Sequence, residues 1–144
     1  MFSKACQYGM RAAIYIAEKS MEDQRVGLKE IAKSIDSPEA FTSKILQQLA
    51  KAKIINSEKG PYGGFMMSPK NLEQIKLSHI VSAIDGNQIF AGCALGLKKC
   101  SEQQPCALHH DFKIIRDQIK ATLEGTLIKT LALEHGDGLS FLKR

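Results

Sequence analysis

The chain of 144 residues contains no tryptophan, and aromatic residues make up only 6% of it. It also has no apolar run near the roughly 20 residues that are needed to cross a bilayer. The first 19 residues, MFSKACQYGMRAAIYIAEK, have charges spread through them and lack the small-residue cleavage site of a secretory signal. These absences predict a cytoplasmic protein without a membrane-spanning segment.

The short motifs that mark common enzymes are also missing. There is no nucleophile elbow, no phosphate-binding loop, no HExxH metal motif and no pair of carboxylates with a partner base. The C-x-x-C motif of dithiol oxidoreductases is absent as well. We therefore expect a protein that is not an enzyme.

The composition is that of an ordinary globular protein, with 44% hydrophobic and 24% charged residues. The net charge is +5, and it is unevenly distributed. Residues 1–78 contain 12 Lys and Arg against 8 Asp and Glu, a difference of +4, whereas residues 79–144 contain 8 against 7, a difference of +1. The positive first half is compatible with a nucleic-acid partner.

Hydrophobic periodicity predicts a run of three helices followed by a hairpin. Apolar residues recur at helical spacing over residues 3–19, 28–35 and 36–54. Two short β-type runs then flank the turn sequence KGPYGG at residues 59–64. Three helices and a hairpin in this order are typical of a winged helix-turn-helix. We therefore predict a mainly α fold with a small β-hairpin wing.

The third helix and the wing supply the candidate DNA contacts. The third helix of this architecture enters the major groove, and the face opposite its apolar stripe is polar. Lys59 and the glycines at the hairpin tip can reach an adjacent minor groove. The predicted DNA-binding residues are Thr42, Ser43, Lys44, Gln47, Gln48, Lys51, Lys59, Gly60 and Tyr62.

A long amphipathic helix is predicted from Pro105 to about Glu124. It lies beyond the winged domain and needs a surface for its apolar stripe, for which a second copy of the chain is the simplest candidate. A homodimer would place two reading helices about 34 Å apart on a near-palindromic operator in double-stranded DNA. The predicted organisation is a DNA-binding domain over residues 1–85, a cysteine-bearing loop over 86–106, dimerisation helices over 107–134 and a flexible tail over 135–144.

The segment CALGLKKCSEQQPCALHH, residues 93–110, holds three of the four cysteines and two of the four histidines. In a reducing compartment, clustered cysteines bind metal or serve redox chemistry more often than they form disulfides. The spacing C-x6-C-x5-C lacks the close cysteine pair of most structural zinc sites. A zinc site and a reversible disulfide from Cys93 to Cys100 or Cys106 both stay open as alternatives. The fourth cysteine, Cys6, is expected in the core.

The chain resembles the Rrf2 family of transcription regulators, of the IscR and NsrR type. The resemblance is carried by YGMRAAIYIA, LKEIAKSI, FTSKILQQLAKAKII, KGPYGGFMMS, VSAIDG and the cysteine segment, in that order over nearly the whole chain. It implies a dimer of winged helices joined by a long C-terminal helix. It also implies control of operator binding by an iron–sulfur cluster that senses redox state, nitric oxide or iron–sulfur status.

The same resemblance implies the ligands of the cluster. Members of the IscR type supply three cysteines and a histidine three residues after the last one, which matches Cys93, Cys100, Cys106 and His109 here. Three thiolates and one imidazole favour a [2Fe–2S] cluster. His110 is an alternative fourth ligand, as is a residue from the first helix of the partner subunit.

Overall fold

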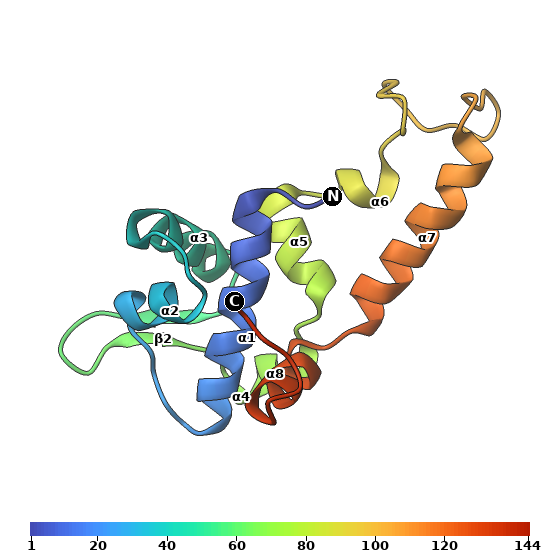
Figure 1. Cartoon of the computed structure of the whole chain (residues 1–144). Coiled ribbons are helices and arrows are strands. Elements are labelled where there is room, and N and C mark those ends of the chain that lie inside the picture. The colour runs from blue at the N-terminus through green and yellow to red at the C-terminus, as the bar shows by residue number, and fades with distance from the viewer.

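The computed structural model describes all 144 residues and contains eight helices and one hairpin (Figure 1). The elements are, in order, α1 Lys4–Met21, α2 Leu28–Ser34, α3 Glu39–Lys51, β1 Asn56–Glu58, β2 Gly64–Met66, α4 Pro69–Gln74, α5 Leu77–Asp85, α6 Gln88–Ala91, α7 His109–Gly125 and α8 Ile128–Gly136. The mainly helical winged fold predicted from the sequence is confirmed. None of the helices combines the length and the apolar character that a membrane crossing requires.

Helix α1 is the centre of the core. It packs against α3, α5 and α8, and its residues Ile16 and Ala13 are fully buried. Cys6 on the same helix is also fully buried, which confirms its predicted place in the core. Gly9 lets α1 approach α5 closely, since a Cβ at this position would collide with the side chain of Ile84. Helix α3, which is predicted to read the DNA, therefore shares one support with α5 and α8.

The turn between α2 and α3 is closed by local polar contacts. The Pro38 carbonyl accepts a hydrogen bond from the Thr42 hydroxyl at 2.8 Å, and the hydroxyls of Ser37 and Thr42 lie 2.7 Å apart. The residue preceding the first turn of α3 is Pro38, whose side chain offers no cap, so the helix begins at Glu39. These contacts draw the Thr42 side chain inward against the turn.

The wing is an antiparallel pair in which Ser57 faces Phe65 and Glu58 faces Gly64. Val26 pairs with β2 on its other edge, because its amide and carbonyl exchange hydrogen bonds with Phe65 at 3.1 and 2.8 Å. Gly64 has a φ of 131°, and a Cβ there would lie 2.8 Å from the Val26 carbonyl oxygen. Glycine at this position therefore allows the wing to dock on the loop that precedes α2.

Helix α7 projects from the winged domain as an arm (Figure 1). Its base is fixed by backbone hydrogen bonds from Leu77 N to Thr126 O at 3.0 Å and from Ile128 N to Ile75 O at 2.9 Å. The predicted start of this helix at Pro105 is wrong, since α7 begins at His109. Residues 105–108 instead form a turn in which the Cys106 carbonyl accepts from the His109 amide at 3.0 Å. The cysteine-bearing loop predicted for residues 86–106 also contains one helical turn, α6.

The C-terminal segment does not form the flexible tail predicted for residues 135–144. Helix α8 extends to Gly136, and Leu142 is buried in the main core. Arg11 donates to the carbonyls of both Ile35 and Leu142, at 2.9 and 3.2 Å. The chain end is therefore fastened to α1 and to the turn that precedes α3.

Gly64→Ala should destabilise the fold by about 1–3 kcal/mol, because alanine at this φ is strained and its Cβ meets the Val26 carbonyl. Urea unfolding followed by circular dichroism at fixed protein concentration measures the effect. The control is Gly125→Ala at the end of α7, where a Cβ would meet no atom within 4 Å and where alanine favours the helix. Equal stability of the Gly64→Ala variant and the wild type would contradict the stated reason for glycine at this position.

Candidate functional site

The three clustered cysteines lie at the tip of the arm, between α6 and α7. Together with His109, they form two pairs of side chains in close contact. Cys93 Sγ lies 3.7 Å from Cys106 Sγ, and Cys100 Sγ lies 3.3 Å from His109 Nδ1. All three thiols are free and half-buried. The fold thus places the four residues that the family resemblance implied as ligands in two separate pairs, Cys93 with Cys106 and Cys100 with His109.

His109 is the histidine that faces the cysteines. Its exposed fraction is 4%, and its Nε2 atom is buried without a hydrogen-bond partner. His110 is exposed, and its ring meets the His109 ring edge-on with centroids 5.2 Å apart. Among the two histidines, only His109 has a ring nitrogen against a cysteine sulfur.

Arg116 contacts the second of these pairs. Its Nη1 atom lies 3.3 Å from Cys100 Sγ and donates to the Gly92 carbonyl at 2.9 Å. The sequence analysis did not identify this residue. The available signal was its position seven residues after His109, which places both side chains on one face of α7 two turns apart.

The local surroundings give the cysteines different acidities. Hydrogen bonding by the backbone of Leu97, and then of Leu95, lowers the pKa of the Cys93 thiol. Burial raises the pKa of Cys6 to about 12, and the negative charge of Asp85 adds to the effect. Thiolate is the reactive and metal-binding form of cysteine, so Cys93 is suited to this chemistry and Cys6 is not.

The donor set fits a soft metal centre in its chemistry. Three thiols and an imidazole are ligands that iron–sulfur clusters accept, and the partnerless Nε2 of His109 is an unusual buried polar atom. No three His, Cys, Asp or Glu side chains converge on one point of the structure. The four donors instead stand as two pairs, Cys93 with Cys106 and Cys100 with His109.

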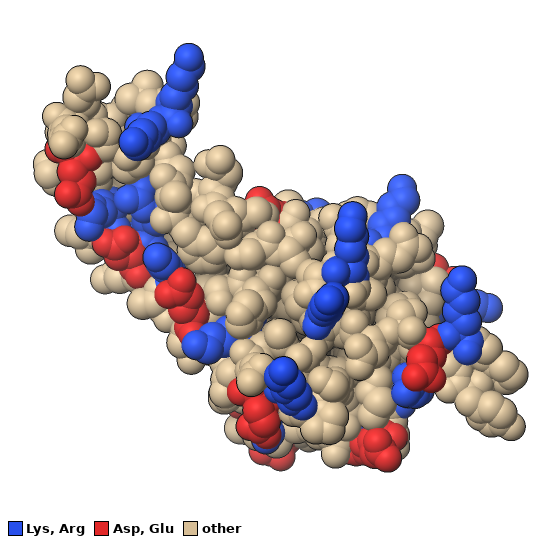
Figure 2. Space-filling model, turned by 180° about the vertical axis from the view of Figure 1, so that it is seen from behind, with Lys and Arg blue, Asp and Glu red and all other residues tan.

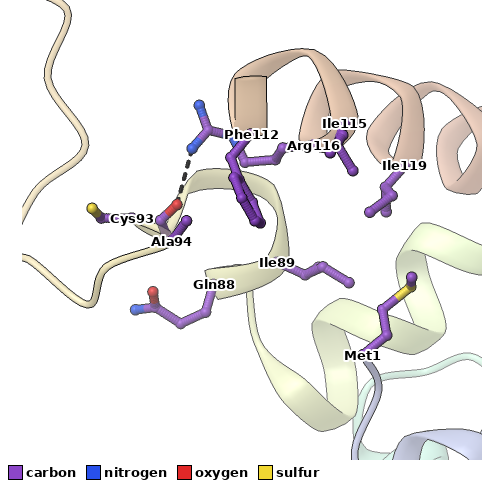
Figure 3. A pocket seen from close by; sticks show the side chains of 10 residues that line it. Met1, Gln88, Ile89, Cys93, Ala94, Phe112, Ile115, Arg116 and Ile119 are labelled. Atoms are coloured by element: carbon purple, nitrogen blue, oxygen red, sulfur yellow. Dashed lines mark hydrogen bonds between the residues drawn. The ribbon is translucent and has the colours of Figure 1, made fainter. Parts of the chain in front are cut away.

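A hollow of about 410 Å³ opens beside the cysteines, between α6 and α7 (Figure 3). Apolar side chains of both helices line it, among them Ile89, Phe112 and Ile119, with Cys93 and Arg116 at one end. Figure 3 shows the Arg116 guanidinium directed at the backbone of the Gly92 turn, where the dashed line marks their hydrogen bond. The polar contacts that Arg116 makes with the cysteine loop therefore lie at one end of an apolar hollow.

The face of α3 that is predicted to contact DNA is largely exposed. Four of its side chains are exposed and Ser43 is half-buried, the exposed ones being Lys44, Gln47, Gln48 and Lys51. The prediction that Thr42 lies on the exposed face is wrong, because Thr42 is fully buried by its contacts with Ser37 and Pro38. Periodicity alone could not reveal this local hydrogen bonding.

The wing residues that are predicted to contact DNA are also exposed. Lys59 and Gly60 are exposed, and Tyr62 at the tip is 92% exposed. Arg25 forms an ion pair with Glu58 at 3.0 Å, which joins the end of β1 to the loop before α2. Seen from behind, the arm has interleaved acidic and basic side chains, whereas Lys and Arg outnumber Asp and Glu over the upper part of the winged domain (Figure 2).

Comparison with known proteins identifies the family. The model of the Rrf2 family, described as an iron-dependent transcriptional regulator, matches residues 2–134. The chain belongs to the Rrf2 family. It is therefore a transcriptional regulator and not an enzyme, and regulators of this family bind DNA.

Individual Rrf2 relatives agree with this assignment. A protein of Aquifex aeolicus named as an HTH-type transcriptional regulator is 33% identical over 133 residues, which is 91% of this chain and 90% of the relative. CymR of B. subtilis, the global cysteine regulator, has a TM-score of 0.74 and 25% identity over 92% of this chain and 96% of its own. IscR of T. potens shares the fold, with a TM-score of 0.74 and 18% identity over 97% of this chain and 91% of its own.

Alkylation of the metal-free, reduced regulator at pH 8 should modify Cys93 at least about a hundredfold faster than Cys6. The reason is that Cys6 is fully buried with a raised pKa, whereas the pKa of Cys93 is lowered. Mass spectrometry of peptides after timed iodoacetamide treatment gives both rates. Treatment in urea is the control, since unfolding should make the two rates similar. Comparable rates in the folded chain would refute the described environments.

Proposed function

We propose that this Rrf2 regulator binds its operator as a homodimer under the control of a [2Fe–2S] cluster. The ligands would be Cys93, Cys100, Cys106 and His109. The observation that carries the proposal is the arrangement of these four donors as two close pairs, at 3.7 and 3.3 Å, with a buried and partnerless histidine nitrogen. Two pairs of donors suit two irons that each take two protein ligands.

When bound, the cluster would supply a centre that changes charge or is lost on contact with oxidants or nitric oxide. Replacement of a thiolate by histidine raises the potential and provides a ligand that protonation can detach. The residues of the chain then transmit the change. Cys93 and Cys100 belong to the loop after α6, whereas His109 is the first residue of α7. A common centre would hold the loop to the arm, and its loss would release the loop.

The arm supports the proposed dimer. Leu123 near its base is buried against Cys6 and Val81 in a small cluster with the winged domain. Farther out, Phe112 and Ile115 are 44% and 48% exposed. This uncovered part of an amphipathic helix is an apolar surface that a second copy would bury. Through the fixed base of the arm, a change at its tip would alter the spacing of the two winged domains.

On DNA, α3 would enter the major groove, with Gln47 and Gln48 toward base edges and the lysines toward phosphates. The wing would approach the neighbouring minor groove through Lys59, Gly60 and Tyr62. The supporting observations are the exposure of these residues and the turn at the tip, where Gly60 has a φ of 103° and its carbonyl accepts from the Gly63 amide at 3.0 Å. A role on genomic DNA agrees with the cytoplasmic location predicted from the sequence.

A second candidate function is a thiol switch without a cluster. It is favoured by the 3.7 Å separation of Cys93 Sγ and Cys106 Sγ, a short movement away from a disulfide bond of about 2.05 Å. In this reaction the two thiols lose two electrons and two protons, and hydrogen peroxide is reduced to two waters. The switch would close the loop between residues 93 and 106 without any metal. Iron and sulfide content separate the two candidates.

Anaerobic reconstitution with iron and sulfide should give a coloured protein with about two irons and two sulfides for each chain. Cys93→Ala, Cys100→Ala and Cys106→Ala should each abolish the visible absorption, because each removes one of the proposed ligands. Cys6→Ala is the matched control and should keep the colour, since Cys6 lies in the core away from the loop. A colourless wild-type chain, or zinc in place of iron, would contradict the cluster.

The affinity of the regulator for DNA from the region upstream of its own gene should fall as the salt concentration rises. Lys44→Ala should lower the slope of log K against log salt by about 0.9 for each lost phosphate contact, or about 1.8 for a dimer. Gel-shift titration at several salt concentrations measures the slope. Lys120→Ala on the exposed side of the arm serves as the control and should leave it unchanged. A salt-independent affinity in all states would exclude this mode of binding.

A further inference from the structure

We infer that Arg116 is a positioning residue that fastens the cysteine loop to the arm. Its Nη1 atom contacts the loop at two places, the Gly92 carbonyl at 2.9 Å and Cys100 Sγ at 3.3 Å. Gly92 precedes Cys93, the first cysteine of the loop, and Cys100 is the second cysteine of the loop. A single guanidinium nitrogen on the third turn of α7 therefore holds both the entry and the middle of the loop. The part of this inference that concerns a cluster rests on the proposed function.

No carboxylate competes with the cysteine loop for the Arg116 guanidinium. Of the nearby carboxylates, Asp117 and Glu102 both lie within 3.8 Å of Lys113 Nζ, and Arg116 has no ion-pair partner. Its Nε atom is buried without a hydrogen-bond partner. A half-buried guanidinium that no carboxylate neutralises is free to donate to the Gly92 carbonyl and to the Cys100 sulfur.

The backbone at Gly92 is shaped for this contact. The Gly92 amide donates to the Gln88 carbonyl at 2.7 Å and so ends α6. A Cβ on Gly92 would lie 2.7 Å from the same carbonyl oxygen, so a side chain here would force the turn to move. The absence of a side chain lets this turn stay tight, with its own carbonyl free to accept from Arg116.

A hydrogen bond to a ligand sulfur has a second consequence if the loop binds a cluster. Donors to cysteine sulfurs stabilise the reduced, more negative state and raise the reduction potential. Arg116 would therefore set how easily the centre at Cys100 is oxidised, in addition to holding the loop. It would act through Cys100 and not as a ligand.

The test compares Arg116→Met, Arg116→Lys and the control Lys120→Met in the full chain. Methionine keeps much of the apolar stem but loses both polar contacts, whereas lysine keeps a charged nitrogen with several hydrogens. In the metal-free, reduced protein, hydrogen exchange of the amides over residues 93–104 should speed up about tenfold in Arg116→Met and less in Arg116→Lys. Lys120→Met should match the wild type.

In the reconstituted protein, redox titration of the visible absorption should give a more negative midpoint potential for Arg116→Met, with Arg116→Lys in between. Loop exchange in Arg116→Met equal to the wild type would overturn the inference, as would an unchanged potential in a loaded variant. If Arg116→Met does not fold, the exchange in Arg116→Lys decides: faster exchange than in the wild type supports the role of the guanidinium, and wild-type exchange overturns it. If the wild type takes up no iron, the proposed cluster fails, and the exchange measurement alone still decides the role of Arg116.

Discussion

The packing of α1 against α3, α5 and α8 is the constraint on which the rest of the molecule depends. Gly9 allows the close contact with α5, and buried residues such as Ile16 join the reading helix to the helices at the foot of the arm. Because this core is closely packed, a displacement at the base of the arm is transmitted to the winged domain. The winged domain and the foot of the arm therefore behave as one body, which is what a regulator needs to turn a remote event into a change of DNA affinity.

The outer arm is organised in the opposite way. Its apolar residues Phe112 and Ile115 remain uncovered, and the cysteine loop touches it through few contacts, of which those of Arg116 and His109 are polar. Regions with few buried contacts open at low free energy, so this tip is the part of the molecule that a ligand or a redox reaction can reorganise. Under the proposed function, the rigid base of α7 would transmit the signal and its adaptable tip would sense it.

The periodic and compositional parts of this architecture could be predicted from the sequence. Apolar spacing located α1, α2 and α3, and the glycines of the wing indicated the hairpin that Gly64 and Val26 now explain. Local polar contacts could not be predicted. Thr42 lies at a position expected to face solvent, yet its hydroxyl is drawn into the turn by Pro38 and Ser37. The same holds for Arg116, whose partners at Gly92 and Cys100 are distant in sequence and meet only after α6 and α7 have packed.

The central claim is that the state of the cysteine loop is coupled to operator binding by α3. Its most direct test measures the operator Kd of one anaerobic preparation before and after the metal is removed, in the wild type and in Cys100→Ala. The account predicts a change of about tenfold or more in the wild type, in line with ordinary allosteric coupling, and none in the variant. The same Kd for the loaded and the stripped wild type would contradict it.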